Sequence, residues 1–366
     1  MPTDRLDVLT LFTPRDLSTR NNSLNMLRLV FALLVVFSHA QLLTVSGDGV
    51  VIFGQHLGSW AVVGFFGISG YLITGARIRS DAGPYLINRV VRIFPAFVFV
   101  LVFVAFFLAP LTMYIESGTI DGYFGTSPTP LDYVYSNLLL KVSYYHIGTT
   151  LSTHPLSAWN GSLWSLSYEF WCYIIIGVFM SWKFIRERVW PTTGLFVLFT
   201  LAHMGIAQLR PYIGNNYDLE LLIFMTPYFM GGAMVYQLRD RLPIRHLYAL
   251  IAAVISLLLI WYFPPFGKQL ASPTMAYLVL YFGSVLPSPG FTKVHDISYG
   301  VYIFHFPIIQ FLIALKVHLL GFWPFLFITL LITCALATAS WFGIERAAMR
   351  WVRGRNPWGD IRKPAH

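Results

Sequence analysis

Charged residues are scarce in this sequence. Asp, Glu, Lys and Arg make up 11% of the 366 residues, whereas hydrophobic types make up 56%. An ordinary soluble domain has about 25% charged residues, so this chain cannot cover a water-exposed surface in the usual way. A soluble globular protein and a disordered chain are therefore both excluded. Cysteine is also rare, and Cys172 and Cys334 lie deep in apolar stretches, so no disulfide framework is indicated.

Long apolar runs are what the sequence has instead. A helix needs roughly 20 residues to cross a hydrocarbon core about 30 Å thick. The runs are long and continuous rather than short and alternating, which favours helices over a membrane β-barrel. The sequence therefore predicts an all-α, polytopic membrane helix bundle with about ten transmembrane helices. The expected spans are 24–43, 57–76, 93–113, 163–182, 190–207, 219–238, 246–264, 271–287, 298–317 and 322–345.

The distribution of Lys and Arg predicts the orientation of the bundle. If the N-terminus is cytoplasmic, 21 of the 25 Lys and Arg residues lie in cytoplasmic segments and four lie outside. Such an asymmetry satisfies the positive-inside rule, so both termini are expected in the cytoplasm and the protein in the cytoplasmic (inner) membrane. The net charge of +9 is thus a topology signal, and no nucleic-acid partner is expected.

The same topology divides the chain into three parts. Residues 1–23 form a cytoplasmic N-terminal segment, 24–345 the transmembrane domain, and 346–366 a basic cytoplasmic tail. The longest outside segment, 114–162, contains a half-apolar stretch and many turn residues. It is expected to be an interfacial helix, a lid over a site, or a plain connector.

Ionisable residues inside the spans are costly and are candidates for function. Arg28 and His39 are eleven residues apart in one predicted helix. A helix turns about 100° and rises about 1.5 Å per residue, so the two side chains share a face about 16 Å apart. A cation at the cytoplasmic rim and a deeper imidazole suggest a channel entered from the cytoplasm. A snorkelling arginine and a structural histidine are the alternative.

Glu169 is the acidic residue expected at a depth similar to that of His39. It lies five residues inside Trp164, which suits the outer interfacial belt. A carboxylate within a membrane needs a partner. His39 is the partner expected, and the two could act as a general base and its orienting group, or as a structural ion pair.

Arg89 and Arg92 are the arginines expected to meet phosphates. They are three residues apart, so they face one way on a helical turn just before Pro95. Guanidinium groups bind phosphate in a bidentate manner, although plain positive-inside charge is the alternative and is favoured for Arg77 and Arg79.

Three further residues complete the candidate site. Ser69 lies in a glycine-rich stripe that also suits close helix packing, and Tyr299 and His305 lie near Pro307 in the ninth span. We expect Ser69, Trp164, Tyr299 and His305 to line a cavity. Glu345 ends the last span and is expected to make boundary contacts beside Arg346.

Six segments, taken together and in order, resemble the acyltransferase-3 family of integral membrane O-acyltransferases, in the stand-alone form without an extracytoplasmic hydrolase-like domain. They cover about residues 24–345. The segments are Arg28-x10-His39, Phe65-Phe66-Gly67-Ile68-Ser69-Gly70, Arg89-x-x-Arg92-Ile93-x-Pro95, Leu163-Trp164-Ser165-Leu166-x-x-Glu169, Ser298-Tyr299-x-x-Tyr302-x-x-His305-x-Pro307 and Ser340-Trp341-Phe342-Gly343-Ile344-Glu345.

The resemblance implies transfer of an acyl group, usually acetyl, from cytoplasmic acyl-CoA to a hydroxyl of an exported or surface glycan. The acceptor would be exopolysaccharide, lipopolysaccharide or a lipid-linked oligosaccharide. His39 would be catalytic with Glu169, Arg28, Arg89 and Arg92 would handle the donor, acetyl-CoA would be the donor substrate, and no metal would be needed. His39 could deprotonate the acceptor or carry the acyl group itself. A transporter or flippase is the alternative, because buried His and Glu also suit a proton-coupled exporter.

Overall fold

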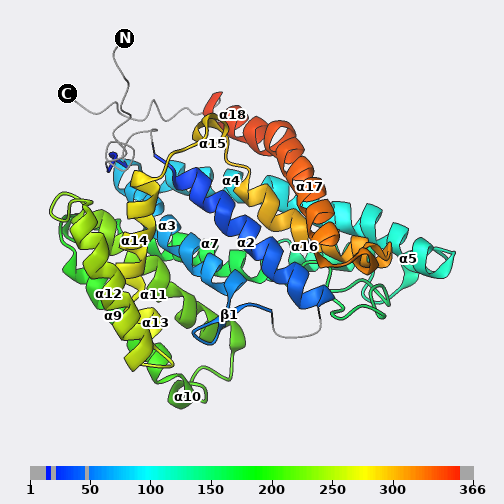
Figure 1. The fold of residues 1–366 in the computed structure, drawn as a ribbon, viewed down its shortest axis with the longest axis horizontal. Helices are drawn as coiled ribbons and strands as arrows, with labels where there is room; N and C mark the ends of the chain where they lie inside the picture. The colour runs from blue at the N-terminus through cyan, green and yellow to red at the C-terminus, as the bar shows by residue number, and fades with distance from the viewer. Residues whose placement is uncertain (1–13, 18–21, 46–48, 355–366) are drawn as a thin grey trace, which may run out of the picture. The chain divides into compact units, whose positions relative to one another are not determined.

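The computed structural model describes residues 14–17, 22–45 and 49–354 (Figure 1). Helices account for nearly all of its regular structure, and the strands of the described chain are β1 (Val51–Ile52) and β2 (Gln55–His56), which form one short antiparallel hairpin. The all-α bundle predicted from the apolar runs is confirmed. Most of the predicted N-terminal segment and residues 355–366 of the predicted tail lie outside the described residues.

Each of the ten predicted spans contains a helix. Within the described chain, five helical stretches are long and apolar enough to cross a membrane, and three shorter apolar helices accompany them. The number of crossings and their orientation stay predictions. The five long stretches are α2 (Leu24–Thr44), α3 (Leu57–Arg79), the run 82–117, α11 (Tyr217–Leu238) and the run 322–352. The three shorter helices are α7 (Trp164–Phe179), α12 (His246–Tyr262) and α16 (Ser298–Ala314).

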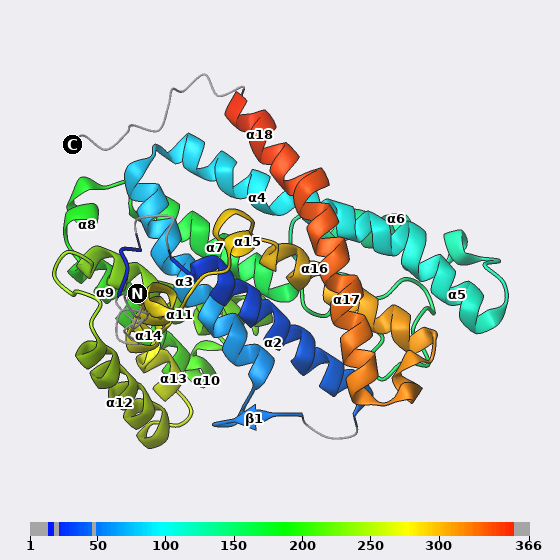
Figure 2. The ribbon, with the colours of Figure 1, turned by 45° about the horizontal axis from the view of Figure 1, so that its top comes forward.

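The run 82–117 begins earlier than hydropathy predicts. Helix α4 (Ala82–Phe103) starts eleven residues before the expected span, passes through a π-helical turn, η1 (Val104–Leu108), and continues as α5 (Ala109–Ser117) (Figure 2). Arginine is a good helix former, so Arg89 and Arg92 lower the hydropathy without ending the helix. Pro95 therefore lies inside α4 instead of opening it.

The chain divides into two compact units, each formed from three separate stretches. The first unit comprises residues 1–30, 62–85 and 171–296, and the second comprises 31–61, 86–170 and 297–366.

In the first unit, α11 packs between α9 (Trp190–Met204) and α14 (Ser272–Val285), and α12 packs against α14. Glycines allow the closest approaches. A Cβ atom on Gly70 of α3 would lie 1.9 Å from the carbonyl oxygen of Phe229, and one on Gly67 would contact Ala276. The small-residue stripe of the second predicted span therefore serves helix packing.

In the second unit, α16 is almost entirely buried and packs along α17 (Phe322–Ser340), which continues through η4 (Trp341–Glu345) into α18 (Arg346–Gly354) (Figure 2). Gly300 permits this contact, because a Cβ there would lie 2.8 Å from the Cα of Ala337.

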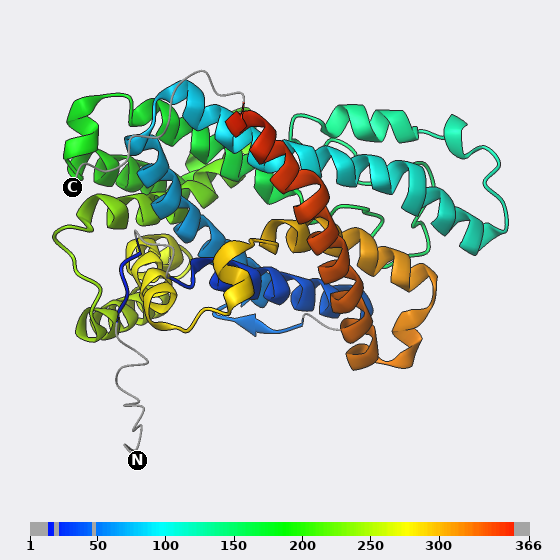
Figure 3. The same ribbon diagram turned by 90° about the horizontal axis from the view of Figure 1, so that it is seen from above.

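The predicted outside segment 114–162 contains one regular helix, α6 (Pro130–Asn137), which packs beside η1 (Figure 3). A capping box starts it: Thr129 accepts from the backbone N–H of Asp132, whose carboxylate accepts from the Thr129 backbone. Hydrogen bonds from the side chain and backbone of Thr129 lower the pKa of Asp132. The half-apolar stretch in this segment is thus partly helical.

Candidate active site

His39 of α2 and His305 of α16 form a hydrogen-bonded pair in the second unit. The Nδ1 atom of His39 lies 2.8 Å from the Nε2 atom of His305. The ring centroids are 5.1 Å apart and the ring planes differ by 10°, as expected for an in-plane hydrogen bond between two imidazoles. Phe306 packs edge-on against His39, with ring centroids 5.1 Å apart. His305 is fully buried, whereas His39 is half-buried, so His39 is the member of the pair that a substrate can reach.

Backbone carbonyls decide where the protons of this pair lie. Nδ1 of His305 is 2.7 Å from the carbonyl oxygen of Tyr302 and 3.3 Å from that of Val301. Carbonyl oxygens only accept, so Nδ1 of His305 carries the hydrogen. In the neutral ring Nε2 is then an acceptor, and Nδ1–H of His39 donates to it. The Nε2 atom of His39 is left with its lone pair, which is the state that a general base or a nucleophile requires.

Glu169 of α7 has different surroundings from those expected. In the described chain, the hydrogen-bond partner of His39 is His305 and not Glu169. Glu169 is half-buried and interacts electrostatically with Tyr299 and Tyr302 of α16. It therefore lies near the helix that carries His305.

Two further hydroxyls connect α7 with α16. Ser165 lies 2.6 Å from the hydroxyl of Tyr302, which also donates to the carbonyl oxygen of Ser162 at 2.8 Å. Trp164, at the start of α7, is half-buried with its ring centroid 5.9 Å from that of Tyr168. These bonds hold the backbone around Tyr302, whose carbonyl fixes the proton of His305.

Arg92 is held by a buried carboxylate. Its Nη1 atom donates to Oε2 of Glu345 at 2.8 Å, and the Glu345 side chain is fully buried. The guanidinium also lies 5.8 Å from the ring centroid of Tyr299 and 5.0 Å from that of Trp341. Tyr299 in turn donates to the carbonyl oxygen of Ile93 at 2.8 Å. Arg92 thus joins α4, α16 and η4, while Arg89 lies one turn earlier on α4 and is half-buried.

The pairing of Glu345 with Arg92 was not predicted from the sequence. We expected boundary contacts beside Arg346, but the π-helical turn η4 turns its side chain inward to Arg92, 253 residues away in sequence. A carboxylate at the end of an apolar run that needs a buried cation was the available signal.

Arg28 and Ser69, the other two predicted site residues, belong to the first unit. Arg28 forms an ion pair with Asp296, and the two side chains are 20% and 11% exposed. Asp296 was not predicted, although it is an acidic residue directly before the ninth span. Ser69 is buried on α3.

A further polar cluster, which joins the segment 114–162 to α16, was not predicted either. Nε2 of His154 is 2.9 Å from a carboxylate oxygen of Glu116, and its Nδ1 is 2.9 Å from Oε1 of Gln310 on α16. The amide nitrogen of Gln310 donates to the carbonyl oxygens of Leu156 and Ala158. In the part of the chain that the structure describes, no group of three or more His, Cys, Asp and Glu side chains could hold a metal ion.

Comparison with known proteins gives the family. A profile described as an acyltransferase domain, of the acyltransferase-3 family, matches residues 21–342. An O-acetyl transferase of Shigella phage Sf6 is 27% identical over 89% of this chain and 96% of its own length. Nodulation protein 10 of Rhizobium leguminosarum bv. viciae is 28% identical over 91% of this chain and 94% of its own. No solved structure matches the chain.

A third relative is longer than this chain. The Bacillus subtilis (strain 168) protein YrhL, provisionally named a peptidoglycan O-acetyltransferase, is 26% identical over 79% of this chain and 51% of its own length. Residues 21–342, which the family profile matches, include the histidine pair and nearly all of the helices described above. The chain belongs to the acyltransferase-3 family and is a membrane-embedded O-acetyltransferase.

Proposed function

We propose that the protein transfers an acetyl group from cytoplasmic acetyl-CoA to a hydroxyl of an exported or surface glycan, with His39 as the catalytic residue. One observation carries the proposal. The hydrogen bond from His39 to His305, whose own proton is fixed by backbone carbonyls, leaves Nε2 of the half-buried His39 as the basic nitrogen.

In direct transfer of the acetyl group from CoA to the acceptor, His39 acts as the single base and is regenerated at the end. Nε2 of His39 takes the proton of the acceptor hydroxyl while the hydroxyl oxygen attacks the thioester carbonyl. The C–S bond then breaks, and the CoA thiolate takes the proton back from the imidazolium. Throughout, Nδ1–H of His39 continues to donate to His305, so the charged ring keeps its orientation.

Transfer through an acyl-histidine uses the same nitrogen. Nε2 of His39 attacks the thioester carbonyl, and the C–S bond breaks to give the CoA thiolate and an acetyl-imidazolium. The acceptor hydroxyl then attacks the acetyl carbon and gives its proton to the thiolate, and the C–N bond breaks to return Nε2 with its lone pair. Both routes depend on the free lone pair at Nε2, so both depend on His305.

In this proposal Glu169 and Tyr299 affect His39 indirectly, through α16, the helix that carries His305. Glu169 supplies negative charge near Tyr302 and Tyr299, which favours a positive imidazolium in the neighbourhood. Arg89 is proposed to contact the donor, whereas Arg92 positions the helices through Glu345. Trp164 is proposed to line the substrate path. Arg28 and Ser69, which belong to the first unit, stay predictions from the sequence.

The relatives support the class of acceptor. One is named an O-acetyl transferase and another a peptidoglycan O-acetyltransferase, and a polysaccharide hydroxyl or lipid-linked oligosaccharide is the matching acceptor here. Placing the termini in the cytoplasm and the protein in the inner membrane follows from the positive-inside distribution of Lys and Arg. Acetyl-CoA then approaches from the cytoplasmic side.

Acetyl-CoA consumption by the purified full-length protein in lipid nanodiscs tests the proposal. We expect wild type to release CoA when glycan acceptor is present and His39→Ala to be at least about 100-fold slower, as for loss of a general base. His39→Gln retains a donor to His305 but has no basic nitrogen, so it should be equally slow. A folded His39→Ala that transfers acetyl at the wild-type rate would refute the assignment, and a wild type that releases no CoA would refute acetyl-CoA as the donor.

A further inference from the structure

A cavity of about 300 Å³ lies in the first unit, at the ends of helices that the sequence places near the cytoplasm. Its wall is formed by Leu17 and Asn22, the start of α2, the last turns of α3 and α11, and α15 (Gly290–Val294). Its volume is in the range of small-molecule sites. The predicted catalytic residues are not among those that line it.

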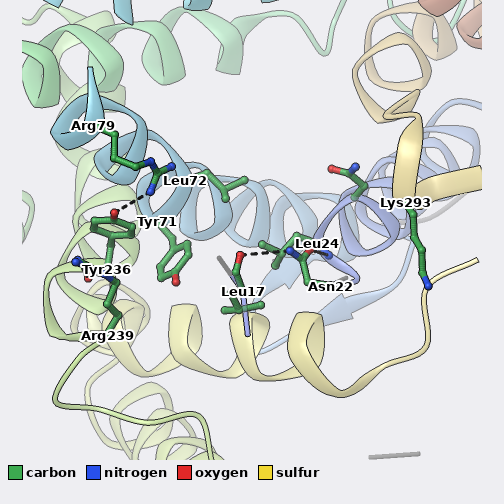
Figure 4. Close-up of a pocket in the computed structure, with 10 residues that line it drawn as sticks. Leu17, Asn22, Leu24, Tyr71, Leu72, Arg79, Tyr236, Arg239 and Lys293 are labelled. Atoms are coloured by element: carbon green, nitrogen blue, oxygen red, sulfur yellow. Dashed lines mark hydrogen bonds between the residues drawn. The ribbon is translucent and has the colours of Figure 1, made fainter. Parts of the chain in front are cut away.

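Three cations line this cavity. Arg79 and Arg239 lie at one end and Lys293 at the other, with Tyr71 between them (Figure 4). Arg79 donates to the hydroxyl of Tyr236 at 2.9 Å, which holds its guanidinium at the cavity wall. In the described parts of the chain, neither Arg79 nor Lys293 has a carboxylate within ion-pair distance.

Two carboxylates lie near the cavity, and one of them pairs with a lining cation. Asp240 pairs with Arg239 at 3.2 Å, and Asp16 interacts electrostatically with Tyr71. Arg79 and Lys293 therefore carry most of the attraction for an anion, and Arg239 adds to it.

Arg77 shows what a purely structural arginine looks like on the same helix. It is 3% exposed and donates to the carbonyl oxygens of Gly177 and Ser80 and to the hydroxyl of Ser181. Its donors are used within the protein. Arg79, two residues later, is exposed and uses one donor on a tyrosine, so the two arginines that the sequence treated alike have different surroundings.

The remaining lining suits a ligand with both polar and aromatic parts. The rings of Tyr71 and Tyr236 meet edge to face, with centroids 5.2 Å apart, and the Arg239 guanidinium lies 4.3 Å from the centroid of the Tyr236 ring. Asn25 is anchored to the carbonyl oxygen of Thr292, which fixes α15 to the start of α2. Cations at both ends with aromatic rings between them fit a heteroaromatic ligand that carries several phosphates.

We propose that this cavity binds the phosphorylated adenosine end of the acyl-CoA donor, with Arg79 and Lys293 as the principal phosphate contacts. The inference rests on the proposed function, because it assumes an acyl-CoA donor. The phosphate of an anionic phospholipid headgroup has the same chemistry, so the experiment must separate the two sources.

The test measures CoA affinity by isothermal titration with the full-length protein in phosphatidylcholine nanodiscs. We expect Arg79→Gln and Lys293→Gln each to weaken CoA binding by about 10-fold or more, as for loss of a charge-assisted hydrogen bond. Lys183→Gln is the matched control: it removes one charge from the same unit at an exposed position, outside the cavity, and should leave the affinity unchanged. Arg79 and Lys293 are both exposed, so the variants should fold.

Native mass spectrometry of the same variants, prepared with phosphatidylglycerol, separates the sources. If wild type retains this lipid, both lining variants lose it, and CoA affinity is the same in all proteins, the cavity is a lipid site and the donor assignment is overturned. If neither ligand depends on Arg79 or Lys293, the cavity is no phosphate site. If wild type transfers acetyl and the variants bind CoA normally, this inference fails and the proposed function stands. If CoA binding depends on Arg79 and Lys293 but wild type transfers no acetyl group, the inference stands and the proposed function fails.

Discussion

Replacing Arg92 with alanine should destabilise the protein instead of merely weakening donor binding. The change would remove the guanidinium that donates to the fully buried Glu345 and that lies against the rings of Tyr299 and Trp341. Removing one partner of a buried ion pair costs about 3–5 kcal/mol. The Arg92 side chain is 17% exposed, so Glu345→Ala leaves a cation that can still reach water, and its cost should be smaller, about 1–3 kcal/mol.

A double-mutant cycle in detergent measures this difference. We expect the unfolding free energy of Arg92→Ala to fall more than that of Glu345→Ala, and the double variant to be less destabilised than the sum of the two, because no buried charge is left unpaired. Arg92→Lys should be milder than Arg92→Ala. If Arg92→Ala keeps wild-type stability and instead raises the KM for acetyl-CoA, Arg92 binds phosphate as the sequence suggested, and the structural role assigned to it is wrong.

Two further predictions concern packing and the segment 114–162. Gly70→Ala should prevent accumulation of folded protein, because its Cβ would lie 1.9 Å from a backbone carbonyl oxygen, whereas Gly194→Ala on α9 meets nothing within 4 Å and should be tolerated; fluorescence size-exclusion chromatography compares the two. Glu116→Ala should loosen the segment, because the change removes one of the two side chains that hold the ring of His154, the other being Gln310 of α16. Limited proteolysis at neutral pH should cut within 114–162 faster in this variant, and an unchanged rate would contradict the pairing.

The fold was largely predictable, because a membrane imposes helices wherever a long apolar run occurs. Hydropathy failed where a helix is amphipathic: α4 begins at Ala82, and the arginines of its first half resemble a cytoplasmic loop. The capped helix α6 was only suggested, since a half-apolar stretch is compatible with several structures.

The sequence predicted which residues belong to the site, but it did not predict which of them contact one another. Sequence position gives the depth of His39, but not which helix lies beside it, so the contact with His305, 266 residues away, could not be derived. The same holds for Arg92 with Glu345. The basic cavity was hidden for another reason, because the positive-inside rule already accounted for Arg79 and Lys293 as topological charge.

The rate of a single acetyl-transfer turnover in His305 variants tests most directly whether His305 fixes the basic nitrogen of His39. His305→Leu removes the acceptor for Nδ1–H of His39, and His305→Gln can supply one through its amide oxygen. The account predicts a turnover rate for His305→Leu close to that of His39→Ala, a clearly higher rate for His305→Gln, and an unchanged affinity for CoA in both. Equal rates for His305→Leu and wild type in folded protein would contradict it.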